Sequence, residues 1–156
     1  MDALLILKWL HILSATVLFG TGLGTAAHLW MTHRLGSVPA IAAATANAVR
    51  ADWWFTASSG VLQPTTGAAL IWIAGYDPFA PWLLAAYGLY ALAGTCWAVV
   101  AVLQIRARDL AQEAARSGQP LPTAYFRIMR SWYALGWPAF LALIAVFWLM
   151  VAKPGG

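Results

Sequence analysis

The side chains best suited to bind a metal or a cofactor in this chain of 156 residues are its three histidines. His11 lies inside a long apolar stretch, and His28 and His33 lie near the end of that stretch. A neutral imidazole can ligate haem iron or copper. A histidine inside a membrane helix is costly and normally faces a partner. We therefore expect His11 to be either an axial ligand of haem or a hydrogen-bonded residue in a helix-packing groove.

The spacing of the histidines limits the kind of cofactor site that one chain can form. His11 and His28 are 17 residues apart, which is about 25 Å along a helix, so they cannot ligate the same metal ion. The chain has no histidine after His33, which excludes a pair of haems with two histidine ligands each. A single haem on His11 would take Met150, water, the His11 of a second copy, or nothing as its second axial ligand.

His28 and His33 have a less specific interpretation. Both lie where the first helix should leave the membrane, so we expect them to act as polar anchors at the interface. The alternative is a copper site that adds the thioether of Met31 to these two histidines.

Gln63 and Pro64 mark the most polar part of the second apolar stretch. Pro64 has no backbone N–H, so it leaves the carbonyl of Gly60 without its helical donor near the middle of the membrane. Ser59, Gln63 and Thr66 could restore the missing hydrogen bond, as polar side chains often do at a kink. Alternatively, these side chains form a polar niche for the edge of a quinone or a porphyrin.

Several other functions lack the residues that they require. The sequence contains no Walker loop, no GxSxG nucleophile motif and no HExxH zinc motif. No carboxylate lies within a predicted span, which argues against a proton relay or a site for a hard cation. The single cysteine, Cys96, excludes an intrachain disulfide.

Four long apolar stretches must position these residues. Hydrophobic residues make up 62% of the chain and charged residues only 9%, which is more apolar surface than a water-soluble domain can bury. We predict a single all-α domain over residues 1–156, an integral membrane four-helix bundle. The spans are expected at about 3–27, 53–74, 82–105 and 132–152. The alanine-rich residues 40–51 should form an amphipathic extension of the second span.

The nine lysines and arginines set the expected orientation of the bundle. Lys8 and Lys153 lie near the two ends of the chain, whereas the seven arginines lie in or beside the first and third connections. The positive-inside rule then places both connections in the cytoplasm and both termini on the periplasmic side of a bacterial inner membrane. The net charge of +4 reflects this topology and does not indicate a nucleic-acid partner.

The sequence also resembles a known group of membrane proteins. Residues 8–11 (Lys-Trp-Leu-His), Phe19-Gly20 and residues 28–33 resemble the first helix of HemJ-type protoporphyrinogen oxidases and of their four-helix relatives, which include CopD-like proteins. Residues 151–154 resemble the end of the same fold. Residues 135–140 (Leu-Gly-Trp-Pro-Ala-Phe) are more similar to an uncharacterised family of predicted bacterial integral membrane proteins within that group.

This resemblance implies a haem site in a membrane oxidoreductase. In HemJ-type proteins the matching histidine of the first helix is implicated in binding haem b, so the resemblance assigns the iron to His11. A later histidine of that helix falls near His33, and a proline of the second helix matches Pro64. We accordingly expect haem b on His11, with Lys8 near a propionate at the outer interface and Gln63 lining the cavity.

The resemblance is incomplete at residues that matter for catalysis in that family. The family's third helix carries a histidine and a catalytically important lysine where this chain has Leu84 and Ala86. An Asn-Glu pair before the proline of the fourth helix is replaced within residues 133–137. The resemblance therefore implies haem binding rather than the oxidation of protoporphyrinogen.

Two other functions stay open at this point. The chain could be a cofactor-free membrane subunit whose small-residue faces, such as that of Gly20 and Gly24, pack against a partner protein or a second copy. It could instead handle copper through His28, Met31 and His33. The lipid bilayer is a partner in every case.

Overall fold

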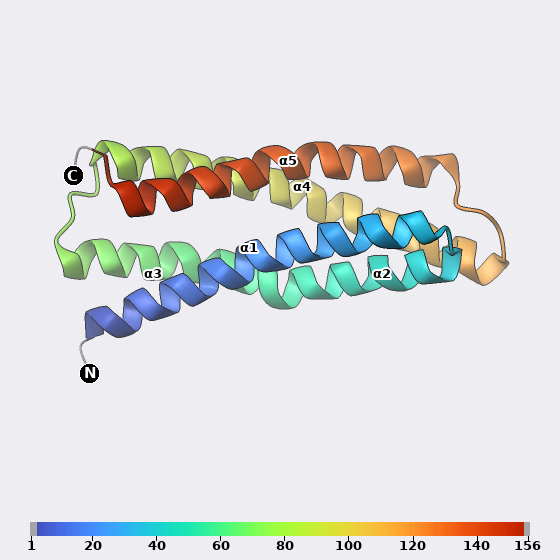
Figure 1. Cartoon of the computed structure of the whole chain (residues 1–156), viewed down its shortest axis with the longest axis horizontal. Helices are drawn as coiled ribbons and strands as arrows, with labels where there is room; N and C mark the ends of the chain where they lie inside the picture. Colours follow the sequence, from blue (N-terminus) through green and yellow to red (C-terminus); the bar gives the residue numbers. More distant parts are fainter. Residues whose placement is uncertain (1–2, 155–156) are drawn as a thin grey trace.

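The computed structural model describes residues 3–154, which form helices and contain no strand (Figure 1). Five of the elements are α-helical and one, η1, is a short π-helical stretch. They are α1 (Ala3–Leu35), α2 (Val38–Ala51), η1 (Asp52–Ala57), α3 (Ser58–Ala74), α4 (Pro81–Ser117) and α5 (Thr123–Ala152).

Elements α2, η1 and α3 form one continuous rod. The backbone keeps right-handed helical angles at Ala51, Asp52 and Ser58, where one element passes into the next. The alanine-rich residues therefore extend the second span, as the sequence predicts. Four antiparallel rods result, with both ends of the described chain at the same end of the bundle (Figure 1). The predicted all-α membrane bundle of four helices is confirmed.

The turns between the rods lie where glycine and proline predict them. Ser37 caps α2 by accepting a hydrogen bond from the amide of Ala40 at 3.4 Å, and Pro39 lies in the first turn, where its missing N–H costs nothing. Gly75 and Gly118 end α3 and α4 in the left-handed conformation, with φ of 70° and 64°, which glycine adopts without steric cost.

The helices extend well beyond three of the predicted spans at the end opposite the termini. Helix α1 continues to Leu35, α4 continues to Ser117, and α5 already begins at Thr123. The polar residues 106–130 are thus helical apart from the short turn after Ser117, since alanine, arginine and glutamine are good helix formers. We refer to this end of the bundle as the arginine-rich end and to the other as the terminal end.

Apolar side chains form both the core and most of the surface of the bundle. A hydrophobic core lies toward the arginine-rich end and contains Leu29, Ile41, Ala44, Ala48, Val100, Ala107, Ala111, Tyr125, Met129 and Trp132. Large apolar side chains are exposed at both ends of the bundle, for example Leu35 at 77% and Trp72 at 86%. Helices α1, α4 and α5 are each long and apolar enough to cross a membrane, and the 17 residues of α3 continue from η1. The exposed apolar surface is therefore the surface that lipid covers.

Candidate functional site

His11 lies half-buried where α1 packs against α3. Its Nδ1 atom is 2.7 Å from Oγ1 of Thr66. The Thr66 hydroxyl also donates to the carbonyl of Leu62 at 2.6 Å. A hydroxyl group has a single proton to donate, so Thr66 accepts the hydrogen bond from His11 Nδ1–H. This pattern assigns the proton of the neutral ring to Nδ1 and the lone pair to Nε2.

The Nε2 atom of His11 is the chemically available atom of this cluster. Nε2 has no hydrogen-bond partner within residues 3–154. It is also not one of the fully buried polar atoms that lack a partner. An imidazole that donates through one nitrogen is held in a fixed orientation, and its other nitrogen can ligate a metal or accept a proton.

Gln63 and Ser14 hold the backbone of α1 beside this histidine. The amide nitrogen of Gln63 donates to the carbonyl of His11 at 2.7 Å and to Oγ of Ser14 at 2.6 Å. Ser14 in turn donates to the His11 carbonyl at 3.1 Å. The hydrogen bonds of the Gln63 amide nitrogen thus join α3 to α1 beside His11. The expected role of Gln63 in lining a haem cavity stays a prediction.

Gly67 allows α3 to approach the imidazole closely. A Cβ atom added at Gly67 would lie 3.4 Å from Cε1 of His11, which is already van der Waals contact. Alanine would therefore just fit at this position, and a longer side chain would displace the ring.

Tyr90 restores the hydrogen bond that Pro64 removes, which corrects the partners expected from the sequence. The Tyr90 hydroxyl on α4 donates to the Gly60 carbonyl at 2.7 Å. Gln63 and Thr66, two of the expected partners, direct their hydrogen bonds to other acceptors. The carbonyl that Pro64 leaves without a helical donor is thus satisfied from a neighbouring helix rather than by these side chains of α3.

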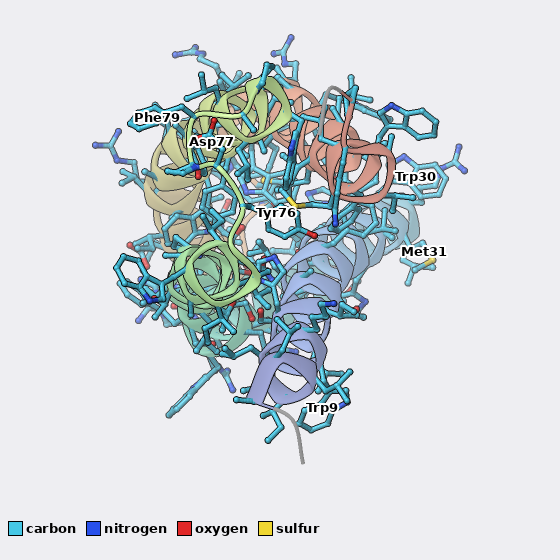
Figure 2. All side chains as sticks on the ribbon, turned by 90° about the vertical axis from the view of Figure 1, so that its left-hand side faces the viewer. Trp9, Trp30, Met31, Tyr76, Asp77 and Phe79 are labelled. Carbon is cyan, nitrogen blue, oxygen red and sulfur yellow. The ribbon has the colours of Figure 1, made fainter. Side chains whose placement is uncertain are left out.

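Lys8 lies exposed about one helical turn beyond His11 on α1. It takes part in no ion pair within the described residues. The other cation of the terminal end, Lys153, donates to the hydroxyl of Tyr76 at 2.5 Å and lies over its ring. The Lys153 hydrogen bond is the main cause that lowers the pKa of Tyr76, and the charge of Lys8 adds to it. Tyr76 lies in the turn between α3 and α4, at the terminal end that faces the viewer in Figure 2.

His33 is engaged through both ring nitrogens, and its partner Tyr125 was not anticipated from the sequence. Nδ1 lies 2.5 Å from the carbonyl of Leu29, and Nε2 lies 2.6 Å from the hydroxyl of Tyr125. The Tyr125 side chain is fully buried in the core of the arginine-rich half. His33 thus ties α1 to the start of α5, which fits the interpretation of a polar anchor.

The residues considered for copper do not converge. His28 and Met31 are exposed, whereas His33 points into the bundle toward Tyr125. Figure 2 shows Met31 and Trp30 at the outer surface of the molecule. No cluster of three or more histidine, cysteine or acidic side chains able to hold a metal ion occurs in residues 3–154.

A stripe of polar side chains runs along the inner face of η1 and α3. Its members are all buried and are spaced alternately four and three residues apart: Asp52, Thr56, Ser59, Gln63 and Thr66. This is the spacing of one helix face that points into a bundle. The full stripe was not anticipated from the sequence, although the spacing of these polar residues gives a heptad pattern.

Asp52 forms the end of this stripe nearest the arginine-rich end. Only 8% of the residue is exposed. Its carboxylate accepts hydrogen bonds from Thr56 at 2.8 Å and from the amide of Gln104 at 3.0 Å. The other side of the Gln104 amide accepts from the indole of Trp132 at 2.9 Å. A carboxylate that precedes the second predicted span by one residue is thus directed into the protein.

Comparison with known proteins identifies one family. The model of a family described as predicted integral membrane protein (DUF2269) matches residues 5–154. No curated protein and no solved structure matches the chain. The expected similarity to an uncharacterised membrane family is confirmed, whereas the likeness to HemJ-type and CopD-like proteins stays a prediction.

Proposed function

The chain belongs to the family of predicted integral membrane proteins (DUF2269), and from that premise we propose that it is a bacterial inner-membrane protein that binds haem b through His11. The observation that carries the proposal is the hydrogen bond from His11 Nδ1 to Thr66. Histidines that ligate a metal almost always donate their other N–H to a neighbouring acceptor, which fixes the tautomer and the orientation of the ring. Thr66 supplies that acceptor.

Two features near His11 support the binding of a partly anionic cofactor. Nε2 carries the free lone pair, and Lys8 supplies an exposed positive charge one turn closer to the terminal end, where a propionate group would lie. When bound, haem b supplies one-electron redox chemistry. The protein residues fix the iron ligand, place the cation and hold α1 against α3 through Gln63.

A second ligand of the iron would come from outside the His11 cluster. His28 and His33 lie too far along α1 to reach the same iron. Met150 is half-buried near the end of α5, and α1 touches α5 only lightly. We therefore extend the proposal to water, the His11 of a second copy, or no protein ligand at all as the second partner that the iron would have.

The main rival is a cofactor-free subunit that packs against a partner. The same contacts favour it, because Thr66 already satisfies one polar atom of the ring and Gln63 already joins the two helices. The two proposals differ in what Nε2 does. A packing residue leaves Nε2 unused, whereas a haem ligand needs it.

The direct test is reconstitution of the purified protein with haem, followed by removal of free haem and assay of retained haem as its pyridine complex. We expect the wild type and His28→Leu to retain haem and His11→Leu to lose it. Loss of haem from His28→Leu as well, or equal retention by all three, would overturn the assignment of the iron to His11.

A further inference from the structure

The buried carboxylate of Asp52 lies beside a small cavity between η1 and α4. The cavity has a volume of about 10 Å³, which is near the lower limit for a single water molecule. Besides Asp52, its lining includes Trp53, Trp97 and Gln104.

The cavity has the polar groups that an ordered water requires. The indole Nε1–H of Trp97 is buried and has no hydrogen-bond partner within residues 3–154. Trp97 and Asp52 line the same cavity, and Trp97 lowers the pKa of the Asp52 carboxyl. A buried water normally makes two to four hydrogen bonds to such unsatisfied groups. Trp97 Nε1–H and a carboxylate oxygen of Asp52 provide one donor and one acceptor.

No cation of residues 3–154 forms an ion pair with this carboxylate. Neither of the two ion pairs in the described part of the chain includes Asp52, and its hydrogen-bond partners are neutral. The neighbouring elements carry ionisable side chains near this level of the bundle, none of which pairs with it. They are His28 on α1, Arg50 on α2, Arg106 on α4, and Arg130 and Tyr133 on α5.

We propose that Asp52 is a reversible proton-binding site that exchanges protons with the aqueous phase at the arginine-rich end through a water in this cavity. A buried carboxylate without a cation costs free energy in its charged form, so the site gains a proton more readily than an exposed carboxylate does. The proton comes from hydronium in the aqueous phase at that interface, which becomes water, and release of the proton reverses this step. No other group of the protein changes its charge.

Two further observations support this assignment. Burial raises the pKa of the Asp52 carboxyl, and the polar groups of Thr56, Gln104 and Trp97 offset that rise only in part. The carboxylate also lies in a π-helical stretch, a departure from α-helical geometry that is frequent at functional sites. The site is 11 residues from Gln63 along the same rod, about 16 Å, and is therefore separate from His11.

Infrared spectroscopy of the full-length protein in membranes tests the proposal. We expect the carbonyl stretch of a protonated carboxylic acid to persist at a pH where exposed carboxyls are ionised, and to disappear in Asp52→Asn. It should remain in Asp109→Asn, which removes an exposed carboxylate. Transfer to heavy water should shift the band, because the cavity water exchanges the proton.

A second variant keeps the test decisive if Asp52→Asn folds poorly. Trp97→Phe removes an N–H that faces the carboxylate, so the band should persist to higher pH than in the wild type. The proposal is overturned if the wild type shows no such band at any pH that preserves its helical content. It is equally overturned if the band survives in Asp52→Asn or does not respond to heavy water.

Discussion

The ring nitrogen Nδ1 of His11 and the hydroxyl oxygen of Thr66 lie 2.7 Å apart across the contact between α1 and α3. The Thr66 hydroxyl donates its proton to the carbonyl of Leu62. His11 Nδ1 is therefore the donor and Thr66 the acceptor of the hydrogen bond between them. A polar side chain of α3 thereby fixes the tautomer of a histidine on α1. The available lone pair on Nε2, and with it the proposed haem ligand, depends on this contact.

Replacement of Thr66 by valine should weaken haem binding without unfolding the bundle. Thr66→Val removes the acceptor for Nδ1–H, so the ring is no longer held in one tautomer, and we expect haem affinity to fall about 10- to 100-fold. Haem titration followed by absorbance measures the change. Thr65→Val is the matched control, because the Thr65 hydroxyl is exposed and bonds only to its own helix. Equal losses in the two variants would show that the effect does not act through His11.

The compensation by Tyr90 for the hydrogen bond missing at Pro64 can be measured with a double-mutant cycle. Tyr90→Phe leaves the Gly60 carbonyl without its donor, which should cost about 1–3 kcal/mol of the free energy of unfolding. Pro64→Ala supplies a backbone N–H to the same carbonyl. Tyr90→Phe should therefore cost much less in the Pro64→Ala background, as measured by thermal unfolding in detergent. Equal costs in both backgrounds would mean that the Tyr90 bond does not compensate for Pro64.

His33 should behave as a structural residue and not as a ligand. Tyr125→Phe removes the hydroxyl group that bonds to His33 Nε2. We expect this substitution to lower the free energy of unfolding by about 1 kcal/mol. The amount of haem bound by the folded protein should stay unchanged. His28→Ala, at an exposed position of the same helix, should change neither quantity. A loss of haem from folded Tyr125→Phe would contradict this division of roles.

The stability of the protein should depend on pH through Asp52. The carboxyl has an ordinary pKa of 3.8, and burial raises the pKa in the folded protein. Between these two values the folded protein keeps a proton that the unfolded chain has lost, so the free energy of unfolding falls as the pH rises through that window. Below this window both the folded and the unfolded protein carry the proton, so Asp52 no longer makes the free energy of unfolding depend on pH.

Unfolding midpoints of wild type and Asp52→Asn at a series of pH values test this dependence. The stability of the wild type should fall relative to that of Asp52→Asn as the pH rises above 3.8, whereas Asp109→Asn should follow the wild type. A constant difference between wild type and Asp52→Asn at every pH would contradict the account.

The architecture was predictable because apolar periodicity and turn chemistry are local. The four rods, the turns near Gly75 and Gly118 and the role of Pro39 follow from residues a few positions apart. The position of His11 inside the bundle also follows from its place in an apolar stretch. Its neighbour Gln63 was identified from the break that Pro64 introduces.

The partners of the site residues were not predictable, because they come from distant parts of the chain. Tyr90 pairs with Gly60 across 30 positions, and Tyr125 pairs with His33 across 92. Which hydroxyl reaches which acceptor depends on how the helices rotate against each other. That rotation is set by the packing of all four rods. The residue pattern of a single helix carries no information about this packing.

Asp52 shows a different limit. A carboxylate at the edge of a span normally faces water, so its position alone indicates nothing. The spacing of the polar residues from Asp52 to Thr66 does indicate a common face. The pattern indicates a polar interior of the bundle only when Asp52, which precedes the predicted span, is considered together with the polar residues inside the span.

The most direct test of the central claim is a dithionite-reduced minus oxidised absorption spectrum of the detergent-purified protein from cells with ample haem. His11→Ala and His28→Ala are recorded beside the wild type. We predict a sharp b-type α-band in the wild type and in His28→Ala that is absent from His11→Ala. A flat spectrum of the wild type, or a band that persists in His11→Ala, would contradict the assignment of haem b to His11.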